Sequence, residues 1–253
     1  MKKILIIILA LGMMLSLSAC SLLLLAADET DGNTNSTESN TTNPADGTSN
    51  PYEITYSSVK TYKNSIGLTW AQAIVEIENT GSYNLFLKPG TCDLEDSEGN
   101  LVASKDMSAY PQIIAPGEKA YYYEEYALDS VAEDTVLQII PRPEIVRSTT
   151  EHITYSVSDV SITASEYGYL KVMGRVENTS DSEDSLIYVA ITLFNEASEP
   201  IGLVSTVISN DLAPGEKVGF EATALSLPDE VTADSIASYS AVVYPYQFQI
   251  DFN

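Results

Sequence analysis

An internal repeat constrains the fold of this chain more than any other feature of its sequence. Matches that keep their order while their spacing changes by a single residue indicate two copies of one folding unit. Each copy must therefore build its own hydrophobic core from roughly a hundred residues. The matching motifs lie 98 or 99 residues apart: Ile54–Ser57 recurs at Ile153–Ser156, Glu78–Thr80 at Glu177–Thr179, and Ala115–Lys119 at Ala213–Lys217.

Apolar side chains at every second position predict β-strands in both copies. Within Trp70–Asn79 the odd positions from 71 to 77 are all apolar, which predicts a strand with one buried face. No long apolar pattern of helical period follows Pro51, and only Asp129–Thr135 suits a short helical turn. The other runs with strand periodicity are Val172–Asn178, Leu186–Phe194 and Tyr244–Asn253.

The predicted fold is all-β, with two tandem immunoglobulin-like β-sandwich domains after a signal peptide and a disordered linker. Domain 1 is expected over residues 52–143 and domain 2 over residues 150–253, and a small barrel is the alternative for each. Pro141 and Pro143 predict a strand end or a linker between the domains, because proline lacks the N–H that the interior of a sheet requires. Turn residues separate the strands, notably at Pro116-Gly117 and Pro214-Gly215.

The N-terminus predicts export. Lys2 and Lys3 precede an almost wholly apolar run, which is the layout of a secretory signal peptide over residues 1–19. Leu17-Ser18-Ala19-Cys20 resembles the bacterial lipobox, and the resemblance implies that Cys20 becomes the lipidated first residue of the mature chain. Two alternatives stay open: an uncleaved anchor, since Leu22–Ala27 prolongs the apolar run, and cleavage by ordinary signal peptidase.

The segment 20–51 is predicted to be the lipidated N-terminus followed by a disordered polar linker. From Asp28 to Pro51 it has no aromatic residue and no aliphatic residue larger than alanine, so it buries too little apolar area to order itself. The whole chain carries 36 acidic and 12 basic residues, a formal charge of −24. Nucleic acid is therefore not an expected partner, since phosphate binding needs clustered Lys and Arg.

The second copy resembles the FxLYD family of bacterial extracytoplasmic domains. The residues that carry the resemblance are Gly174–Ser180, Ile191–Asn195, and Leu212–Glu216 with the following Phe220. Phe194 and Asn195 depart from the Tyr and Asp usual in the family. The first copy is a looser match through Val75–Asn79, Asp93–Asp96 and Ile114–Glu118, and is also similar to immunoglobulin-like domains of Gram-positive lipoproteins. The resemblance implies an exported, often lipid-anchored module with no shared catalytic residues.

Few residues suggest chemistry. His152 is the only histidine and is expected to be a surface residue at the start of a strand. Cys92 is expected to be a buried, inert thiol. Asp93–Asn100 loosely resembles a calcium loop but lacks the downstream bidentate Glu, so a turn between two strands is the preferred interpretation. Asp181–Asp184 is expected to be a solvated loop.

Tyr121–Tyr126 is the one unusual local feature, with four tyrosines in six residues. On a strand, Tyr121 and Tyr123 face one way while Tyr122 and Tyr126 face the other. One set is expected to fill the core. The other set either forms an exposed aromatic strip for glycan or protein contact, or packs ordinarily with partly covered rings.

These features predict a lipoprotein at the extracytoplasmic face of the cell membrane, acting as a non-catalytic binding or structural module. The predicted anchor residue is Cys20, and no catalytic residue, metal ligand or cofactor is predicted. The membrane is the expected partner through the lipid, and a protein or a cell-wall polymer stays open as a second partner. A carboxylate-based envelope hydrolase and a passive spacer in a membrane complex are the alternative functions.

Overall fold

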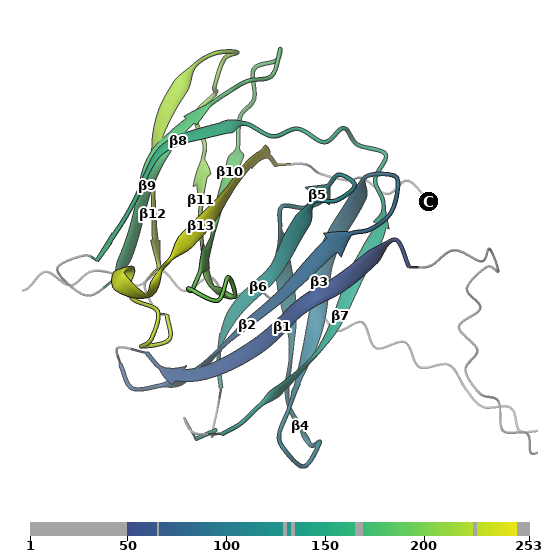
Figure 1. Ribbon diagram of the computed structural model, residues 1–253, viewed down its shortest axis with the longest axis vertical. Helices are drawn as coiled ribbons and strands as arrows, with labels where there is room; N and C mark the ends of the chain where they lie inside the picture. Colours follow the sequence, from purple (N-terminus) through teal and green to yellow (C-terminus); the bar gives the residue numbers. More distant parts are fainter. Residues whose placement is uncertain are drawn as a thin grey trace, which may run out of the picture. The chain divides into compact units, whose positions relative to one another are not determined.

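The computed structural model describes residues 50–64, 66–128, 131–132, 135–164, 169–224 and 227–246. These residues belong to one compact unit and lie mostly in antiparallel strands, so the all-β prediction is confirmed (Figure 1). One short 3-10 helix, η1 (Ala233–Ser235), is the only helix in this part of the chain. In the described ranges no helix has the length and apolar character needed to cross a membrane.

The N-terminal half comprises the first seven strands of the described chain, and they are connected into one sheet system. Six of them follow the order β1-β2-β6-β4-β3-β5, and β7 pairs with β3 from outside this path. The strands are β1 (Tyr52–Lys63), β2 (Thr69–Asn79), β3 (Leu85–Glu95), β4 (Leu101–Tyr110), β5 (Ile113–Ile114), β6 (Lys119–Ala127) and β7 (Gln138–Arg147).

Strand β4 joins two layers of the N-terminal half. Its first part, up to Met107, pairs with β3, whereas Ser108–Tyr110 pair with β6. The β1-β2-β6 layer and the β3-β7 layer are thus linked at a single point, and the apolar side chains between them form one core cluster. This cluster contains the predicted odd positions of β2, from Ala71 to Ile77, all of which are fully buried.

The C-terminal half comprises the six remaining strands of the described chain, arranged in two three-stranded sheets (Figure 1). One sheet has the order β11-β10-β13 and the other β12-β9-β8, and a second core cluster lies between them. The strands are β8 (Ser156–Ala164), β9 (Leu170–Glu177), β10 (Ile187–Phe194), β11 (Pro200–Ile208), β12 (Lys217–Ala224) and β13 (Ser238–Pro245).

The two halves repeat one pairing scheme. In the N-terminal half β2 lies between β1 and β6, and β3 lies between β4 and β7. In the C-terminal half β9 lies between β8 and β12, and β10 lies between β11 and β13. The neighbours of each central strand therefore follow the same order along the chain, as expected for two copies of one folding unit.

A buried asparagine holds the same turn in each half. The side chain of Asn79 is fully buried, donates to the carbonyls of Tyr83 and Ile114, and accepts from the Gly81 N–H. Its backbone carbonyl accepts from Gly117 N–H at 2.8 Å, which ties the end of β2 to the turn before β6. These hydrogen bonds give the buried side-chain amide of Asn79 the partners it needs, so they help to specify the fold at this turn.

The glutamates of the two Ala-Pro-Gly-Glu-Lys motifs close these turns. Glu118 accepts from Ala115 N–H at 2.9 Å, and Glu216 accepts from Ala213 N–H at 3.0 Å. Gly117 and Gly215 have φ values of +81° and +76°, a conformation that glycine adopts without a steric cost. The repeated residues of the sequence therefore build the same turn twice.

The prediction that Pro141 and Pro143 end a strand is wrong. Both lie inside β7, which continues to Arg147. Strand β7 pairs only with β3, so it is an edge strand, and an edge tolerates residues without an N–H. A register shift between Lys88 and Thr91 lies opposite Pro143, whereas Pro141 stays in register with Cys92.

Candidate functional site

The outward face of the β1-β2-β6 layer is covered by the C-terminal half. Ile74 on β2, Tyr121 on β6 and Leu203 on β11 form a small buried cluster, at 2%, 7% and 5% exposure. The Tyr121 ring meets Phe194 of β10 edge-on at 6.2 Å between centroids. Strand β2 is therefore buried on both faces, whereas its alternation predicted one.

This covered face decides the role of the Tyr121–Tyr126 run. Tyr122 and Tyr126 belong to the core of the N-terminal half. Tyr121 and Tyr123 point the other way and pack in the cluster that the C-terminal half completes. Of the two interpretations open for that set, ordinary packing with covered rings is confirmed, and an exposed aromatic strip is wrong.

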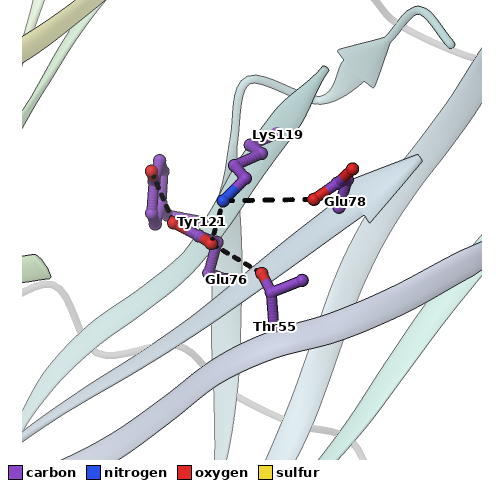
Figure 2. Close-up of polar contacts among 5 residues, drawn as sticks. All are labelled: Thr55, Glu76, Glu78, Lys119 and Tyr121. Carbon is purple, nitrogen blue, oxygen red and sulfur yellow. Dashed lines mark hydrogen bonds and ion pairs between the residues drawn. The ribbon is translucent and has the colours of Figure 1, made fainter. Parts of the chain in front are cut away.

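Glu76 is the centre of a polar cluster at the rim of this contact. It lies on the outward face of β2 and is 7% exposed. Figure 2 shows the side chains of Thr55, Lys119 and Tyr121 directed at its carboxylate. Lys119 Nζ and Thr55 Oγ1 each donate to Oε1 at 2.6 Å, and Tyr121 OH donates to Oε2 at 2.8 Å.

Neighbouring groups keep Glu76 ionised. Burial by itself raises the pKa of a carboxyl group, but the hydrogen bonds from Lys119, Thr55 and Tyr121 outweigh it and lower the pKa of Glu76. Burial and the same bond raise the pKa of Tyr121, which stays a neutral donor. A general acid has to carry a proton near neutral pH, so this arrangement does not suit Glu76 to that role.

His152 joins the two halves rather than beginning a strand. It lies in the segment before β8, which starts at Ser156, and its Nε2 is 2.9 Å from Glu118 Oε2. Its side chain is 18% exposed. The expectation of a surface strand residue is therefore wrong, because the turn before β6 lies against this connecting segment.

A cleft of about 690 Å³ opens beside the Glu76 cluster, between the two halves. Its volume is within the range of ligand-binding clefts. On the N-terminal side the bulge of β1 contributes Thr55 and Tyr56. The other lining residues used below are Glu76, Glu118, Lys119, Tyr121, His152, Tyr155, Phe194, Glu199, Ser238 and Ser240.

Cys92 lies outside the cleft. It is fully buried on β3, and its Sγ is 2.8 Å from the Tyr126 hydroxyl. Burial raises the pKa of this thiol, so the reactive thiolate is disfavoured. The prediction of a buried thiol is confirmed, and the surroundings match the expected lack of reactivity.

The Asp93–Asn100 segment forms a turn, as preferred from the sequence. Asp96 accepts from the N–H groups of Glu98 and Asn100, both at 2.9 Å, while Asp93 is bound by Ser104 and Arg142. The bonds from Ser104 and Arg142 lower the pKa of Asp93, and a bond from the Asn100 side-chain amide, together with these N–H groups, lowers that of Asp96. Throughout the described ranges, no three His, Cys, Asp or Glu residues gather in a way that would hold a metal ion.

Residues 181–183 of the Asp181–Asp184 loop are exposed, as expected, whereas Asp184 is half-buried. Asp184 accepts a short hydrogen bond from Tyr155 OH and forms an isolated bridge with Leu212. Burial, and after it this bond, raises the pKa of Tyr155. The loop therefore helps hold the start of β8 in place.

Several predicted features fall on residues outside the described ranges. These include the signal peptide, Cys20, most of the 20–51 linker, most of Asp129–Thr135, and the chain beyond Tyr246. No family model matches the chain, and no curated protein matches its sequence.

Sequence reasoning missed Glu76 and Lys119. No sequence pattern pairs these two residues: Lys119 lies beside Glu76 because β2 and β6 pair antiparallel, with Lys119 opposite Glu78. The partner that covers this face comes from more than a hundred residues later, and nothing local in the sequence reveals it.

Proposed function

We propose that the chain is a lipoprotein anchored through Cys20 to the extracytoplasmic face of the cell membrane. In this proposal its two halves are tandem immunoglobulin-like domains, the second similar to the FxLYD family. They act as a non-catalytic module that binds a cell-wall polymer or another protein. The lipobox resemblance at Leu17–Cys20 and the polar segment after it support the location.

The observation that carries the proposal is that the residues repeated in the two halves form hydrogen bonds within the fold. Asn79 and Asn178 satisfy buried backbone groups, and Glu118 and Glu216 close the turns before β6 and β12. The residues on which the family resemblance rests therefore have structural roles. A module whose shared motifs hold a framework, with its recognition surface elsewhere, is typical of sandwich domains that bind rather than react.

The bonding of Glu76 does not suit it to act as the acid of a hydrolytic carboxylate pair. A carboxylate pair for glycoside hydrolysis needs one group that is protonated at working pH and one that is not. Glu76 has a lowered pKa and three donors on its two oxygens. Its bonding matches a group that fixes the geometry of the cleft.

Fractionation and metabolic labelling test the anchor. The full chain is expressed in a bacterial host and labelled with a fatty-acid analogue. We expect label in the membrane fraction, and we expect Cys20→Ala to lose all of it while keeping the strand content measured by circular dichroism. Label retained by Cys20→Ala would contradict the proposed anchor.

Incubation with isolated cell walls tests the mode of action. The full chain, purified in detergent, is expected to sediment with the walls and to release no soluble fragments from them. Release of saccharide fragments would show an enzyme. Failure both to sediment with walls and to cross-link to any membrane or envelope protein in cells would contradict the proposed binding module.

A further inference from the structure

We infer that the cleft between the two halves binds an uncharged saccharide chain. This inference rests on the proposed function, because it names the ligand class of the same binding module. It follows from the charge, the hydroxyl groups and the aromatic rings of the cleft.

The charge of the lining excludes polyanions. Three carboxylates, from Glu76, Glu118 and Glu199, face one ammonium, from Lys119, with His152 beside them. The ammonium is already paired with Glu76 at 2.6 Å. An anionic polymer would meet net like charge both here and over a chain of formal charge −24, which costs affinity and slows encounter.

The floor of the cleft offers small hydroxyl side chains. Ser238 and Ser240 lie on the outward face of β13, opposite Phe194 and Thr192 of β10, and both are exposed. Neither hydroxyl is bonded to another described side chain. A hydroxyl group both donates and accepts, so such a surface matches the hydroxyl groups of a sugar.

Aromatic rings border the same floor. Phe194 is half-buried and lies opposite Ser238 of β13, so its ring borders the cleft beside the β13 hydroxyls. Tyr56 is half-buried and lines the cleft as well, whereas Tyr121 and Tyr155 are buried in its wall. A sugar ring has an apolar C–H face and a polar rim, and therefore needs aromatic surface and hydrogen-bonding groups side by side.

An extended peptide is the rival occupant, because β13 is the last strand of its sheet and has an unpaired edge. Part of that edge is already used, since Tyr155 N–H donates to the Val243 carbonyl at 2.9 Å. A peptide added as a further strand would have to displace the segment around Tyr155, or it could pair only with the first residues of β13. The outward face, with its serines, is the more accessible surface.

Titration of the full-length protein with chitotetraose and cellotetraose tests the inference, with tetragalacturonate as the anionic comparison. Binding is followed by calorimetry and by saturation-transfer NMR. We expect one or both neutral tetrasaccharides to bind and the anionic one not to. Stronger binding of tetragalacturonate, or no binding of either neutral probe, would overturn the inference.

Two matched substitutions locate the site. Ser240→Tyr places a large ring on the floor of the cleft and is expected to weaken binding about tenfold or more. Ser161→Tyr makes the same change at an exposed position of β8 outside the cleft and is expected to leave binding unchanged. Equal effects of the two, or none from either, would show that the saccharide binds elsewhere.

The outcomes also separate this inference from the proposed function. If a neutral or cationic peptide binds, is blocked by Ser240→Tyr, and the saccharides do not bind, the ligand class is wrong while the binding module stands. If the saccharides bind in the cleft and are cleaved, the site stands while the non-catalytic function fails.

Discussion

Asn178 makes in the C-terminal half the same three side-chain hydrogen bonds that Asn79 makes in the N-terminal half. Asn178 donates to the carbonyls of Ser182 at 2.8 Å and Leu212 at 2.7 Å and accepts from Ser180 N–H at 2.9 Å. Asn79 has its counterparts at 2.9, 3.0 and 3.0 Å. Both side chains are fully buried, so the two copies share the same buried hydrogen-bonded asparagine.

Substitution of either asparagine by alanine is expected to destabilise the protein by about 2–3 kcal/mol, because buried carbonyls and an N–H lose their partners. Urea unfolding followed by circular dichroism measures the change. Asn195→Ala serves as a control, since Asn195 bonds to backbone N–H groups in an exposed turn. Its cost is expected to be about 1 kcal/mol or less. Equal costs at all three positions would contradict the structural role.

Glu76→Gln is expected to cost about 2 kcal/mol at pH 7, because charge-assisted bonds from Lys119 and Tyr121 are lost. The folded pKa of Glu76 is lowered, so its stabilising contribution is fully present above the ordinary value of 4.5 and is lost as pH falls through the folded value. The difference between wild type and variant should therefore shrink on acidification.

Urea unfolding at pH 7 and at successively lower pH values measures this effect. Glu78→Gln is the matched control, because Glu78 lies 4.0 Å from the same ammonium but is more exposed. Its cost is expected to stay below about 0.5 kcal/mol. A cost for Glu76→Gln that does not change with pH would contradict the ionised state assigned to Glu76.

Glu125→Gln is expected to stabilise the protein at pH 7, whereas Glu76→Gln destabilises it. Burial raises the pKa of Glu125, and the Tyr123 hydroxyl donates to it, a bond that glutamine keeps. Because the pKa of Glu125 is higher in the folded state than in the unfolded state, ionised Glu125 destabilises the fold. The destabilisation is complete above the folded-state pKa and absent below the ordinary pKa of 4.5.

The variant should therefore be more stable than wild type by about 1 kcal/mol at pH 7 and equal to it in acid. Thermal unfolding at both pH values measures the difference, with the exposed Glu53→Gln as the control. A loss of stability at pH 7 would show that the charge of Glu125 has a partner that favours it.

Gly174→Ala is expected to destabilise the protein by about 2 kcal/mol, the usual cost of overpacking. A Cβ at this position would lie 2.7 Å from two ring carbons of Phe220, which is buried in the second core. Gly219→Ala is the control on the neighbouring strand, where the nearest atom would lie 3.8 Å away. Urea unfolding that ranks the two variants in the reverse order would contradict the packing of Phe220.

The sequence was sufficient to predict what depends on local periodicity. The buried odd positions of Trp70–Asn79 and the turns at Gly117 and Gly215 follow from alternation and from glycine. These features depend on residues a few positions away in the sequence or on the pairing of adjacent strands. A pattern of period two indicates which face of such a strand is buried.

The contact between the two halves was not predictable in the same way. Tyr121 has the pattern of a solvent-facing strand residue, yet Phe194 and Leu203 cover it. Whether an outward face is covered depends on how the two cores pack against each other, and no local pattern records that. The edge position of Pro141 is likewise a property of the finished sheet.

Sedimentation of the full chain with isolated cell walls, compared between wild type, Ser240→Tyr and Ser161→Tyr, tests the account most directly. The account predicts that wild type and Ser161→Tyr sediment with the walls and that Ser240→Tyr stays in solution with its fold intact. Equal sedimentation of all three proteins would contradict recognition through the cleft.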